Sequence, residues 1–388
     1  MSKISDLIES MCPNGVRFCK IGEVAEVGTG SSNGNESDDN GKFPFFVRSQ
    51  TIKRKNTYEY DEEAIIIPGE GGIGEIFHYI NGKYALHQRV YRIHFISNLL
   101  DSRFAYYYFS AYFKAFILRK AVSATVTSIR KPMIEQFPIP LPPLPVQQEI
   151  VRILDHFTEL TAELTAELTA RRKQYAYYRD ALLTISNENQ PVWKTVGEIS
   201  SFRRGSFPQP YGNKDWYDGE GAMPFVQVAD IGENMRLVSN TKRKISKLAQ
   251  PKSVFAPTGS IIISLQGSIG RIAITQYDSY IDRTVAIFQN ISSDINSKYF
   301  VYQLQRIFSI KERTARGSTI KTITKEEFTS FQIPIPSLEE QERIVSILDR
   351  FDALCNDLTR GLPAEIAARQ KQYEYYRDKL LTFKEFGA

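Results

Sequence analysis

Two segments of this 388-residue chain repeat each other almost letter for letter. Residues 147–157 read QQEIVRILDHF and residues 341–351 read QERIVSILDRF, while residues 173–180 read KQYAYYRD and residues 371–378 read KQYEYYRD. In each copy, apolar residues recur at the three- and four-residue intervals of an amphipathic helix. Two such matches in one order do not arise by chance. The chain is therefore an internal duplication in which each half ends in a helix.

The first helical copy contains a short tandem repeat, TELTAELTAELTA, at residues 158–170. Ala, Glu and Leu are strong helix formers, and the four-residue period aligns the leucines in one slowly drifting stripe. The pattern predicts one helix from about Val146 to Leu183. At about 1.5 Å per residue this helix is roughly 55 Å long, more than the core of a small domain needs. We expect it to act as a spacer.

The second helical copy is longer and less regular. Phe351 is 22 residues ahead of the first tyrosine of its KQY motif, compared with 18 residues in the first copy, so this copy is longer by one four-residue unit. It also contains Gly361 and Pro363. Because proline lacks the N–H group that a helix needs, the sequence predicts a kink or break at this point.

The segments ahead of the two helices also match each other, more faintly. Four pairs match in one order: residues 16–30 with 191–205, 64–74 with 260–270, 125–129 with 319–323, and 137–140 with 331–334. Between them lie short β-branched or aromatic runs, at residues 65–67, 84–96, 225–228 and 261–264, and two expected helices, at residues 102–119 and 297–313. These blocks are predicted to be mixed α+β. The predicted organisation is a block at 1–140, a helix at 141–186, a block at 187–335 and a helix at 336–388.

Composition sets limits without naming a function. The chain is 42% hydrophobic and 24% charged, as in ordinary globular proteins. It has no apolar run of about 18 residues and no signal-peptide pattern at its start, so we expect a cytoplasmic protein. Its three cysteines, Cys12, Cys19 and Cys355, lack metal-ligand spacing and are expected to be reduced thiols. A net charge of +5 is compatible with a polyanionic partner but does not identify one.

Motifs for catalysis are weak or missing. Residues 69–74 (GEGGIG) fit the G-x-G-x-x-G dinucleotide pattern, but residues 75–96 read as strands and not as the helix that would hold a pyrophosphate. A tight turn between strands is the better interpretation. There is no G-x-x-x-x-G-K-[ST] loop, and the four histidines, His78, His87, His94 and His156, lack metal spacing. We therefore expect no catalytic residue, metal or cofactor in this chain.

The two blocks instead carry clusters of basic and amide side chains. Lys and Arg neutralise phosphates, while Arg, Gln, Asn and His can read base edges in the major groove of DNA. Any one of these residues could be an ordinary solvated side chain, but two such blocks in one chain favour DNA. The candidate DNA-binding residues are Arg48, Gln50, Lys53, Arg54, Lys55, His87, Gln88, Arg89, Arg130, Lys131, Arg203, Arg204, Gln209, Tyr211, Asn213, Lys214, Gln227, Lys242, Arg243, Lys244, Gln266, Arg271, Arg283 and Lys321.

Taken together, these features resemble the specificity (S) subunit of type I restriction–modification systems, of the kind with Thr-Ala-Glu-Leu spacer repeats. The resemblance rests on the paired helical motifs, the two Tyr-Tyr-Arg-Asp segments, and the segments AIIIPGEGGIG and SIIISLQGSIG, and it covers essentially the whole chain. It implies an α+β fold with two target-recognition domains. These domains are expected to be separated by two long antiparallel helices that pack as a coiled coil with pseudo-twofold symmetry.

The resemblance also implies a function. Such a subunit binds a bipartite asymmetric DNA target, one half-site per domain, with helix length setting the spacer. It carries no catalysis and is a scaffold for two methyltransferase (M) subunits and for restriction (R) subunits. S-adenosylmethionine, ATP and magnesium are then expected in those partners. Three alternatives stay open from the sequence: a helical adaptor protein, the specificity subunit of an orphan methylation system without restriction, and an enzyme that uses the glycine-rich loop.

Overall fold

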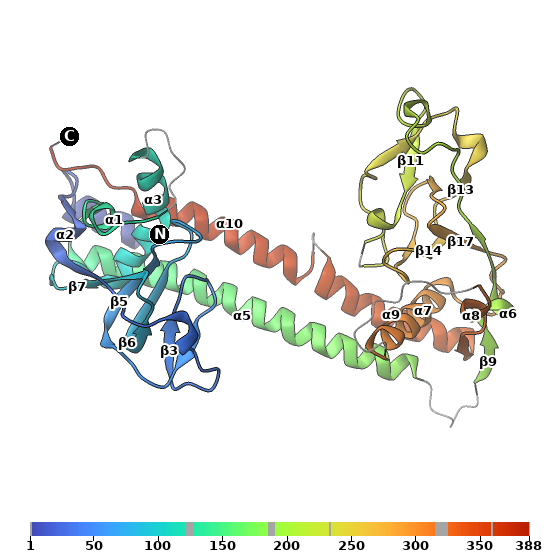
Figure 1. Ribbon diagram of the computed structural model, residues 1–388, viewed down its shortest axis with the longest axis horizontal. Helices are drawn as coiled ribbons and strands as arrows, with labels where there is room; N and C mark the ends of the chain where they lie inside the picture. Colours follow the sequence, from blue (N-terminus) through green and yellow to red (C-terminus); the bar gives the residue numbers. More distant parts are fainter. Residues whose placement is uncertain are drawn as a thin grey trace. The chain divides into compact units, whose positions relative to one another are not determined.

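The structure is a computed structural model that describes residues 2–120, 128–184, 191–232, 234–314, 325–357 and 360–387 (Figure 1). It divides into two compact units, which we call unit 1 (Met1–Leu164 with Ile366–Ala388) and unit 2 (Thr165–Glu365). Both units contain β-sheet and helices, which confirms the predicted α+β class.

Unit 1 is built on a six-stranded sheet in the order β2-β7-β5-β6-β3-β4. Its strands are β2 (Ala25–Thr29), β3 (Phe43–Phe46), β4 (Lys53–Lys55), β5 (Tyr60–Pro68), β6 (His78–Leu86) and β7 (Val90–Phe95). A separate strand pair joins β1 (Phe18–Lys20) to β8 (Pro138–Pro140), and the helices are α1 (Ser2–Met11), α2 (Ile21–Val24), α3 (Ser102–Lys120) and α4 (Lys131–Glu135). The aromatic face of α3, with Phe104, Phe109 and Phe113, packs in one core with Ile65 and Ile93 of the sheet.

Unit 2 has two four-stranded sheets, ordered β10-β17-β14-β15 and β12-β11-β16-β13, and a separate pair β18-β9. The strands are β9 (Val192–Thr195), β10 (Ser201–Arg204), β11 (Met223–Val226), β12 (Arg243–Ile245), β13 (Val254–Ala256), β14 (Ile261–Ser264), β15 (Ile272–Ile274), β16 (Ser279–Ile281), β17 (Val285–Gln289) and β18 (Gln332–Ile335). The helices are α6 (Val196–Ile199), α7 (Ser297–Thr314) and α8 (Lys325–Thr329), with short 3-10 turns η3 (Lys214–Trp216), η4 (Val228–Asp230) and η5 (Gln250–Lys252).

Strand pairing confirms the internal duplication. In unit 1, β3 is antiparallel to β4 and parallel to β6; in unit 2, β11 is antiparallel to β12 and parallel to β16. The pairs β1–β8 and β2–β7 likewise have counterparts in β9–β18 and β10–β17. The helices predicted at residues 102–119 and 297–313 are α3 and α7. The expected strand at residues 84–96 is wrong as one run, because a turn at His87–Val90 separates β6 from β7.

The long helices agree closely with the sequence prediction. Helix α5 runs without interruption from Leu144 to Leu183 and includes the whole Thr-Ala-Glu-Leu repeat. The second copy is two helices, α9 (Leu338–Asn356) and α10 (Leu362–Leu381), so the predicted break is confirmed. Pro363 is the second residue of α10, a position where a missing N–H costs nothing.

Equivalent aromatic residues hold α5 against its partners within each unit. In unit 1, Phe157 of α5 stacks on Tyr376 of α10 with ring centroids 5.4 Å apart. In unit 2, Tyr178 of α5 stacks on Phe351 of α9 at 5.7 Å. Phe157 and Phe351 occupy the same place in the repeated motif, as do Tyr178 and Tyr376. Each half thus supplies the phenylalanine of one pair and the tyrosine of the other.

A buried glutamine joins each long helix to its own block. The Gln147 amide nitrogen donates to the carbonyl oxygens of Leu99 (2.8 Å) and Pro142 (2.7 Å), and its oxygen accepts from the Asp101 amide (2.8 Å). The same three bonds recur in unit 2. There, the Gln341 nitrogen donates to the Asp294 and Pro336 carbonyls, each at 2.9 Å, and its oxygen accepts from the Asn296 amide at 2.7 Å. Asp101 and Asn296 also cap the helices α3 and α7 through their side chains.

All three cysteines are buried and free, as expected. Within the described residues, no group of His, Cys, Asp and Glu is placed to hold a metal ion, and no helix is long and apolar enough to cross a membrane.

Replacing Gln341 by Leu should lower the free energy of unfolding of unit 2 by about 3 kcal/mol, because three buried backbone groups lose their partners. Both tryptophans, Trp193 and Trp216, lie in unit 2, so urea unfolding followed by tryptophan fluorescence reports on this unit. The neighbouring Glu342 is exposed, and Glu342→Leu is the matched control, with an expected change within about 0.5 kcal/mol. Equal effects of the two variants would contradict the role of Gln341 in joining the long helix to its block.

Candidate nucleic-acid interface

Part of the candidate set comes together around two equivalent turns, one in each unit. The turn His87–Val90 joins β6 to β7, and Asp282–Val285 joins β16 to β17. In each turn the amide of the fourth residue donates to the carbonyl of the first at 2.9 Å. The amide of the first residue donates at 3.0 Å to the carbonyl of the neighbouring parallel strand, at Phe46 in unit 1 and at Val226 in unit 2. The two turns therefore share one backbone structure.

The side chains of these turns differ. In unit 1 the sequence is His-Gln-Arg-Val, and in unit 2 it is Asp-Arg-Thr-Val. The first residue of each is buried, at 7% exposure for His87 and 3% for Asp282, and the second, Gln88 or Arg283, is exposed. One backbone thus presents two different chemistries at matching positions.

A glycine packs closely against the backbone of each turn. A Cβ atom added to Gly30 would collide with the Leu86 carbonyl, and one added to Gly205 would collide with the carbonyls of Ile281 and Asp282. These glycines match in the sequence, at the ends of residues 16–30 and 191–205. The close approach of backbone to backbone explains why both copies need glycine here.

In unit 1, a carboxylate gathers two of the predicted arginines. Glu70 accepts from Arg48 at 3.0 Å and from Arg89 at 2.9 Å. Hydrogen bonding and charge from Arg89, with a further contribution from Arg48, lower the pKa of Glu70. Burial and the same two arginines lower the pKa of His87, which favours its neutral form. Sequence reasoning did not include Glu70, although it belongs to the glycine-rich segment at 69–74. That segment is a turn between β5 and β6, as predicted.

Neighbouring hairpins carry the lysine- and arginine-rich segments. Pro44 pairs with Arg54 across β3 and β4, and Pro224 pairs with Lys244 across β11 and β12. This register makes Lys53-Arg54 equivalent to Arg243-Lys244, which sequence comparison alone did not align. Arg54 donates to the carbonyls of Gly41 (2.5 Å) and Lys42 (2.8 Å). In unit 1, part of this basic hairpin therefore holds the loop beside it.

Lys55 is also engaged within unit 1. Its ammonium group donates to Ser32 and to Glu36, each at 2.6 Å, and its side chain is only 16% exposed. Lys53 donates to Ser37 at 3.4 Å. These contacts orient the residues ahead of β3, which lie next to the His87–Val90 turn through the Ser32–His87 bridge.

In unit 2, cations lie over a cluster of aromatic rings. Phe207 packs against Tyr211 (4.8 Å between ring centroids) and Tyr217 (5.2 Å). Arg283 lies 4.9 Å above the Tyr211 ring, and Arg243 lies 4.8 Å above the Tyr217 ring. These cation–π contacts hold both guanidinium groups in place beside the basic hairpin.

Sequence reasoning found only part of this cluster. It named Tyr211, Arg243 and Arg283 but missed Tyr217 and the pair in which Lys252 lies 4.9 Å above the Trp216 ring. A detectable signal was present, since residues 207–217 read FPQPYGNKDWY and interleave aromatic, amide and basic residues.

Other predicted residues lie around these turns or apart from them. On β10, Arg204 donates to the Arg283 carbonyl at 2.8 Å, and Arg203 is exposed. The backbone amides of Gln227 and Lys242 both donate to Asp230, so these residues share one loop.

Asn213 caps η3, and Lys131 pairs with Glu135 on α4. Exposed positions without a part in these contacts are Gln50, Arg130, Gln209, Lys214 and Gln266. Lys321 lies outside the described residues.

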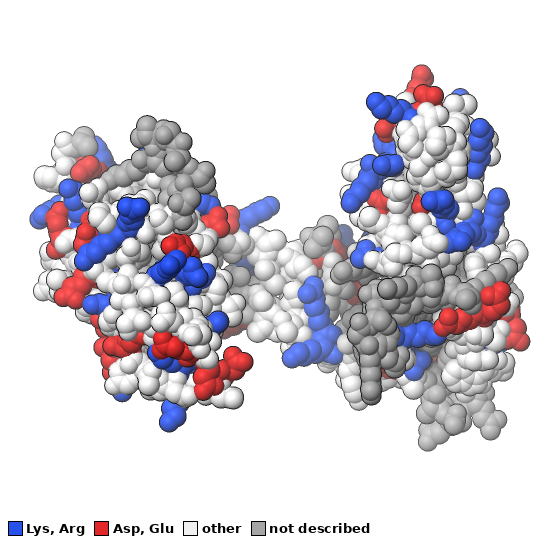
Figure 2. Space-filling view, in the orientation of Figure 1, with Lys and Arg blue, Asp and Glu red and all other residues white. Residues whose placement is uncertain are grey.

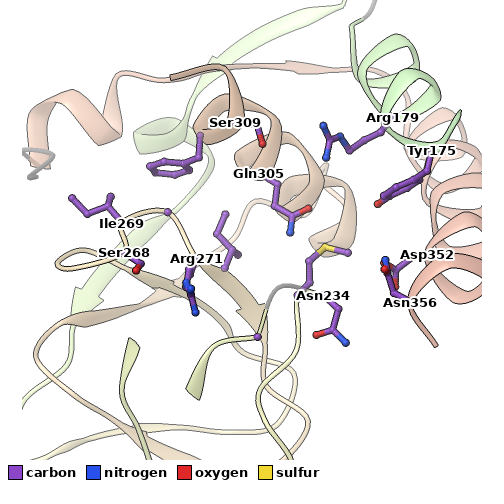
Figure 3. A pocket seen from close by; sticks show the side chains of 15 residues that line it. Tyr175, Arg179, Asn234, Ser268, Ile269, Arg271, Gln305, Ser309, Asp352 and Asn356 are labelled. Atoms are coloured by element: carbon purple, nitrogen blue, oxygen red, sulfur yellow. The ribbon is translucent and has the colours of Figure 1, made fainter. Parts of the chain in front are cut away.

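Arg271 lies in a different environment, a cavity of about 420 Å³ within unit 2. Figure 3 shows Arg179, Tyr175 and Asp352 on helices at one side and Ser268, Asn234 and Arg271 on the other. Both arginines have partners: Arg179 pairs with Asp180 at 2.9 Å, and Arg271 donates to the Ile231 carbonyl at 3.3 Å. Burial raises the pKa of Tyr175 to about 12, so this hydroxyl stays protonated. The described lining residues give no arrangement of base and nucleophile.

Basic side chains are spread over the surface. On the face that Figure 2 presents, Lys and Arg lie over both units with Asp and Glu among them. On this face the basic residues therefore do not form one continuous cationic surface, and the local arrangements at the two turns are the more specific feature.

Comparison with known proteins identifies the family. Residues 13–171 and 193–368 match the model of the type I restriction modification DNA specificity domain. These segments include most of both units, and in each helical copy they include the first repeated motif and end before the KQY motif. The chain belongs to this family.

Relatives of this DNA specificity family resemble the chain over much of its length. The EcoR124I/EcoR124II specificity subunit of Escherichia coli is 40% identical over 263 residues, which are 64% of this chain and 63% of that protein. S.HindORF215P of Haemophilus influenzae, whose name places it among type I restriction enzyme specificity subunits, is 32% identical over 358 residues, 88% of this chain and 89% of that protein.

Solved structures of the family share the fold. The S subunit of a type I restriction–modification system from M. genitalium has a TM-score of 0.60 at 16% identity and covers 95% of this chain and 96% of its own. A chain from a study of complex assembly and conformational transition of the type I R-M system has a TM-score of 0.63 at 18% identity, with coverage of 95% and 98%. The two sheet-rich units and the long helices are thus the fold of type I specificity subunits.

The glycine below each turn gives a test of this geometry. Gly205→Ala should destabilise unit 2 by about 1–3 kcal/mol, because the added methyl group must displace the turn backbone. Hydrogen exchange at the Val285 amide, which closes the turn, should become faster. Gly212 has no atom within 4 Å of its added Cβ, so Gly212→Ala is the control and should leave this exchange unchanged. Unchanged exchange in Gly205→Ala would show that the turn does not depend on the close approach.

Proposed function

We propose that this chain is the DNA sequence-specificity subunit of a type I restriction–modification enzyme. Each unit binds one half of a bipartite asymmetric target, and the chain itself carries no catalysis. The observation that supports this best is the pair of equivalent turns, in which one backbone carries His-Gln-Arg in one unit and Asp-Arg-Thr in the other. Two related surfaces with different side chains suit a target whose two halves differ in sequence.

The partners of the chain are part of the same proposal. Two methyltransferase subunits and restriction subunits assemble on this chain, in the cytoplasm with the DNA, and S-adenosylmethionine, ATP and magnesium belong to those subunits. The helical motifs support two copies of one partner, since Tyr177 (69% exposed) and Tyr375 (62% exposed) occupy the same place in the two KQY motifs. Exposed aromatic residues are typical anchors of protein interfaces.

Expression with the neighbouring methyltransferase subunit in a restriction-deficient host should create one new split methylation motif. Single-molecule methylome sequencing should find modified adenines in both halves of that motif. The control is the same host with the methyltransferase subunit alone. If the complex assembles and no new methylation arises, the chain is an adaptor and not a specificity subunit. Cleavage of unmodified target DNA after the restriction subunit is added would separate a complete system from an orphan methylation system.

The length of α5 should set the spacer between the two half-sites. One Thr-Ala-Glu-Leu unit lengthens a helix by about 6 Å and rotates the part of the helix beyond it by about 40°. One base pair advances DNA by about 3.4 Å and turns it by about 35°. Because the two rotations nearly match, deleting residues 161–164 should shorten the spacer by about one base pair and leave both half-sites unchanged. The methylome of the deletion variant measures this, and an altered half-site or an unaltered spacer would contradict it.

A further inference from the structure

Gln88 and Arg283 hold the same position in the two equivalent turns. Leu86 pairs with Phe46 and Ile281 pairs with Val226 across the parallel strands, so each residue is the second one beyond a matched pair. Both side chains are exposed on turns whose backbones are fixed by the same hydrogen bonds. A ligand that contacts Gln88 in unit 1 therefore contacts Arg283 when it binds unit 2 in the same orientation.

The Arg283 guanidinium is held in place while its N–H groups stay available. It lies 4.9 Å above the Tyr211 ring, and the Tyr211 hydroxyl donates to the Asp282 carboxylate, which also accepts from the Thr284 hydroxyl at 2.6 Å. Arg204 donates a hydrogen bond to the Arg283 carbonyl at 2.8 Å. Among the residues that the structure describes, no carboxylate forms an ion pair with Arg283. A planar, oriented and unpaired guanidinium matches the O6 and N7 acceptors of guanine.

The Gln88 amide is also held in one orientation. The hydrogen-bonding groups that it leaves free differ from those of Arg283. Its nitrogen donates one hydrogen bond to the Asn33 side-chain oxygen at 2.8 Å. A second N–H and the amide oxygen then remain for a ligand. This donor and acceptor pair is the one that binds N7 and N6 of adenine in the major groove.

Charged side chains near Gln88 in unit 1 are already engaged in ion pairs. Arg48 and Arg89 share Glu70, and Lys55 pairs with Glu36. Such residues position the surface and can meet phosphates, whereas Gln88 and Arg283 present unsatisfied hydrogen-bonding groups at the tips of their turns.

We propose that Gln88 reads an adenine in one half-site and Arg283 reads a guanine in the other. This inference rests on the proposed function, and it adds which residues determine the sequence and which bases they select. The two units thus differ at one equivalent position by the exchange of an amide for a guanidinium.

The test uses the purified assembly of this chain with its methyltransferase subunits. Its split motif is first established by methylome sequencing, and binding is then measured to duplexes in which each base pair of the motif is replaced in turn. For the natural chain, replacing one G·C pair in one half and one A·T pair in the other should each weaken binding about 5- to 150-fold.

Two reciprocal variants then assign these pairs. Arg283→Gln should abolish the loss of affinity that follows replacement of the G·C pair, or shift the preference there to A·T. The losses of affinity for replacements in the other half-site should stay unchanged. Gln88→Arg should do the converse at the A·T pair. The half-site that each variant does not touch is an internal control for folding and assembly.

Three outcomes would overturn the inference. A variant that weakens binding to all duplexes by one common factor, including complete loss at low salt, would indicate a phosphate contact or a structural role. A variant that changes no penalty would show that its residue does not read a base. Absence of any motif for the natural chain would overturn the proposed function together with the inference, and this result is distinguishable from the first two.

Discussion

A single buried amide in each half fixes how a recognition block meets its long helix. Gln147 and Gln341 each satisfy three backbone groups that belong to the start of a block helix and to the proline segment ahead of the long helix. Because an unpaired buried carbonyl or amide is costly, the angle between block and helix has little freedom. The identical set of bonds in both halves means that the two blocks leave their helices in the same way.

The duplication keeps the residues that build the structure and changes those that meet a ligand. Stacked pairs such as Phe157 with Tyr376, and the close approach at Gly30 and Gly205, recur in both halves. The exposed residues of the equivalent turns do not recur. Conservation within the chain therefore separates folding from specificity without reference to any other protein, and it explains why the two halves keep a common fold while their sequences match only faintly.

Sequence patterns predicted the parts of this fold that depend on local periodicity. Helical spacing predicted the extent of α5 and the helices α3 and α7. Proline chemistry predicted the break at Gly361 and Pro363, and glycine content predicted the turn at residues 69–74. The contacts of the site could be predicted less well from the sequence. Partners such as Glu70 for Arg48 and Tyr211 for Arg283 are distant in sequence and meet only through strand register. The equivalence of Lys53-Arg54 with Arg243-Lys244 also needed that register, since the segments share little sequence.

The second helical copy is interrupted where α5 is continuous, and this has an evolutionary consequence. Helix α9 ends at Asn356 and α10 begins at Leu362, and Gly361 fits ahead of α10 because a side chain would strike the Ala353 carbonyl. Two separate helices can take up a change of length that one continuous helix would transmit. Copies of the four-residue repeat in α5 can be gained or lost in frame, so a replication slip in one short tract is sufficient to create a new allele.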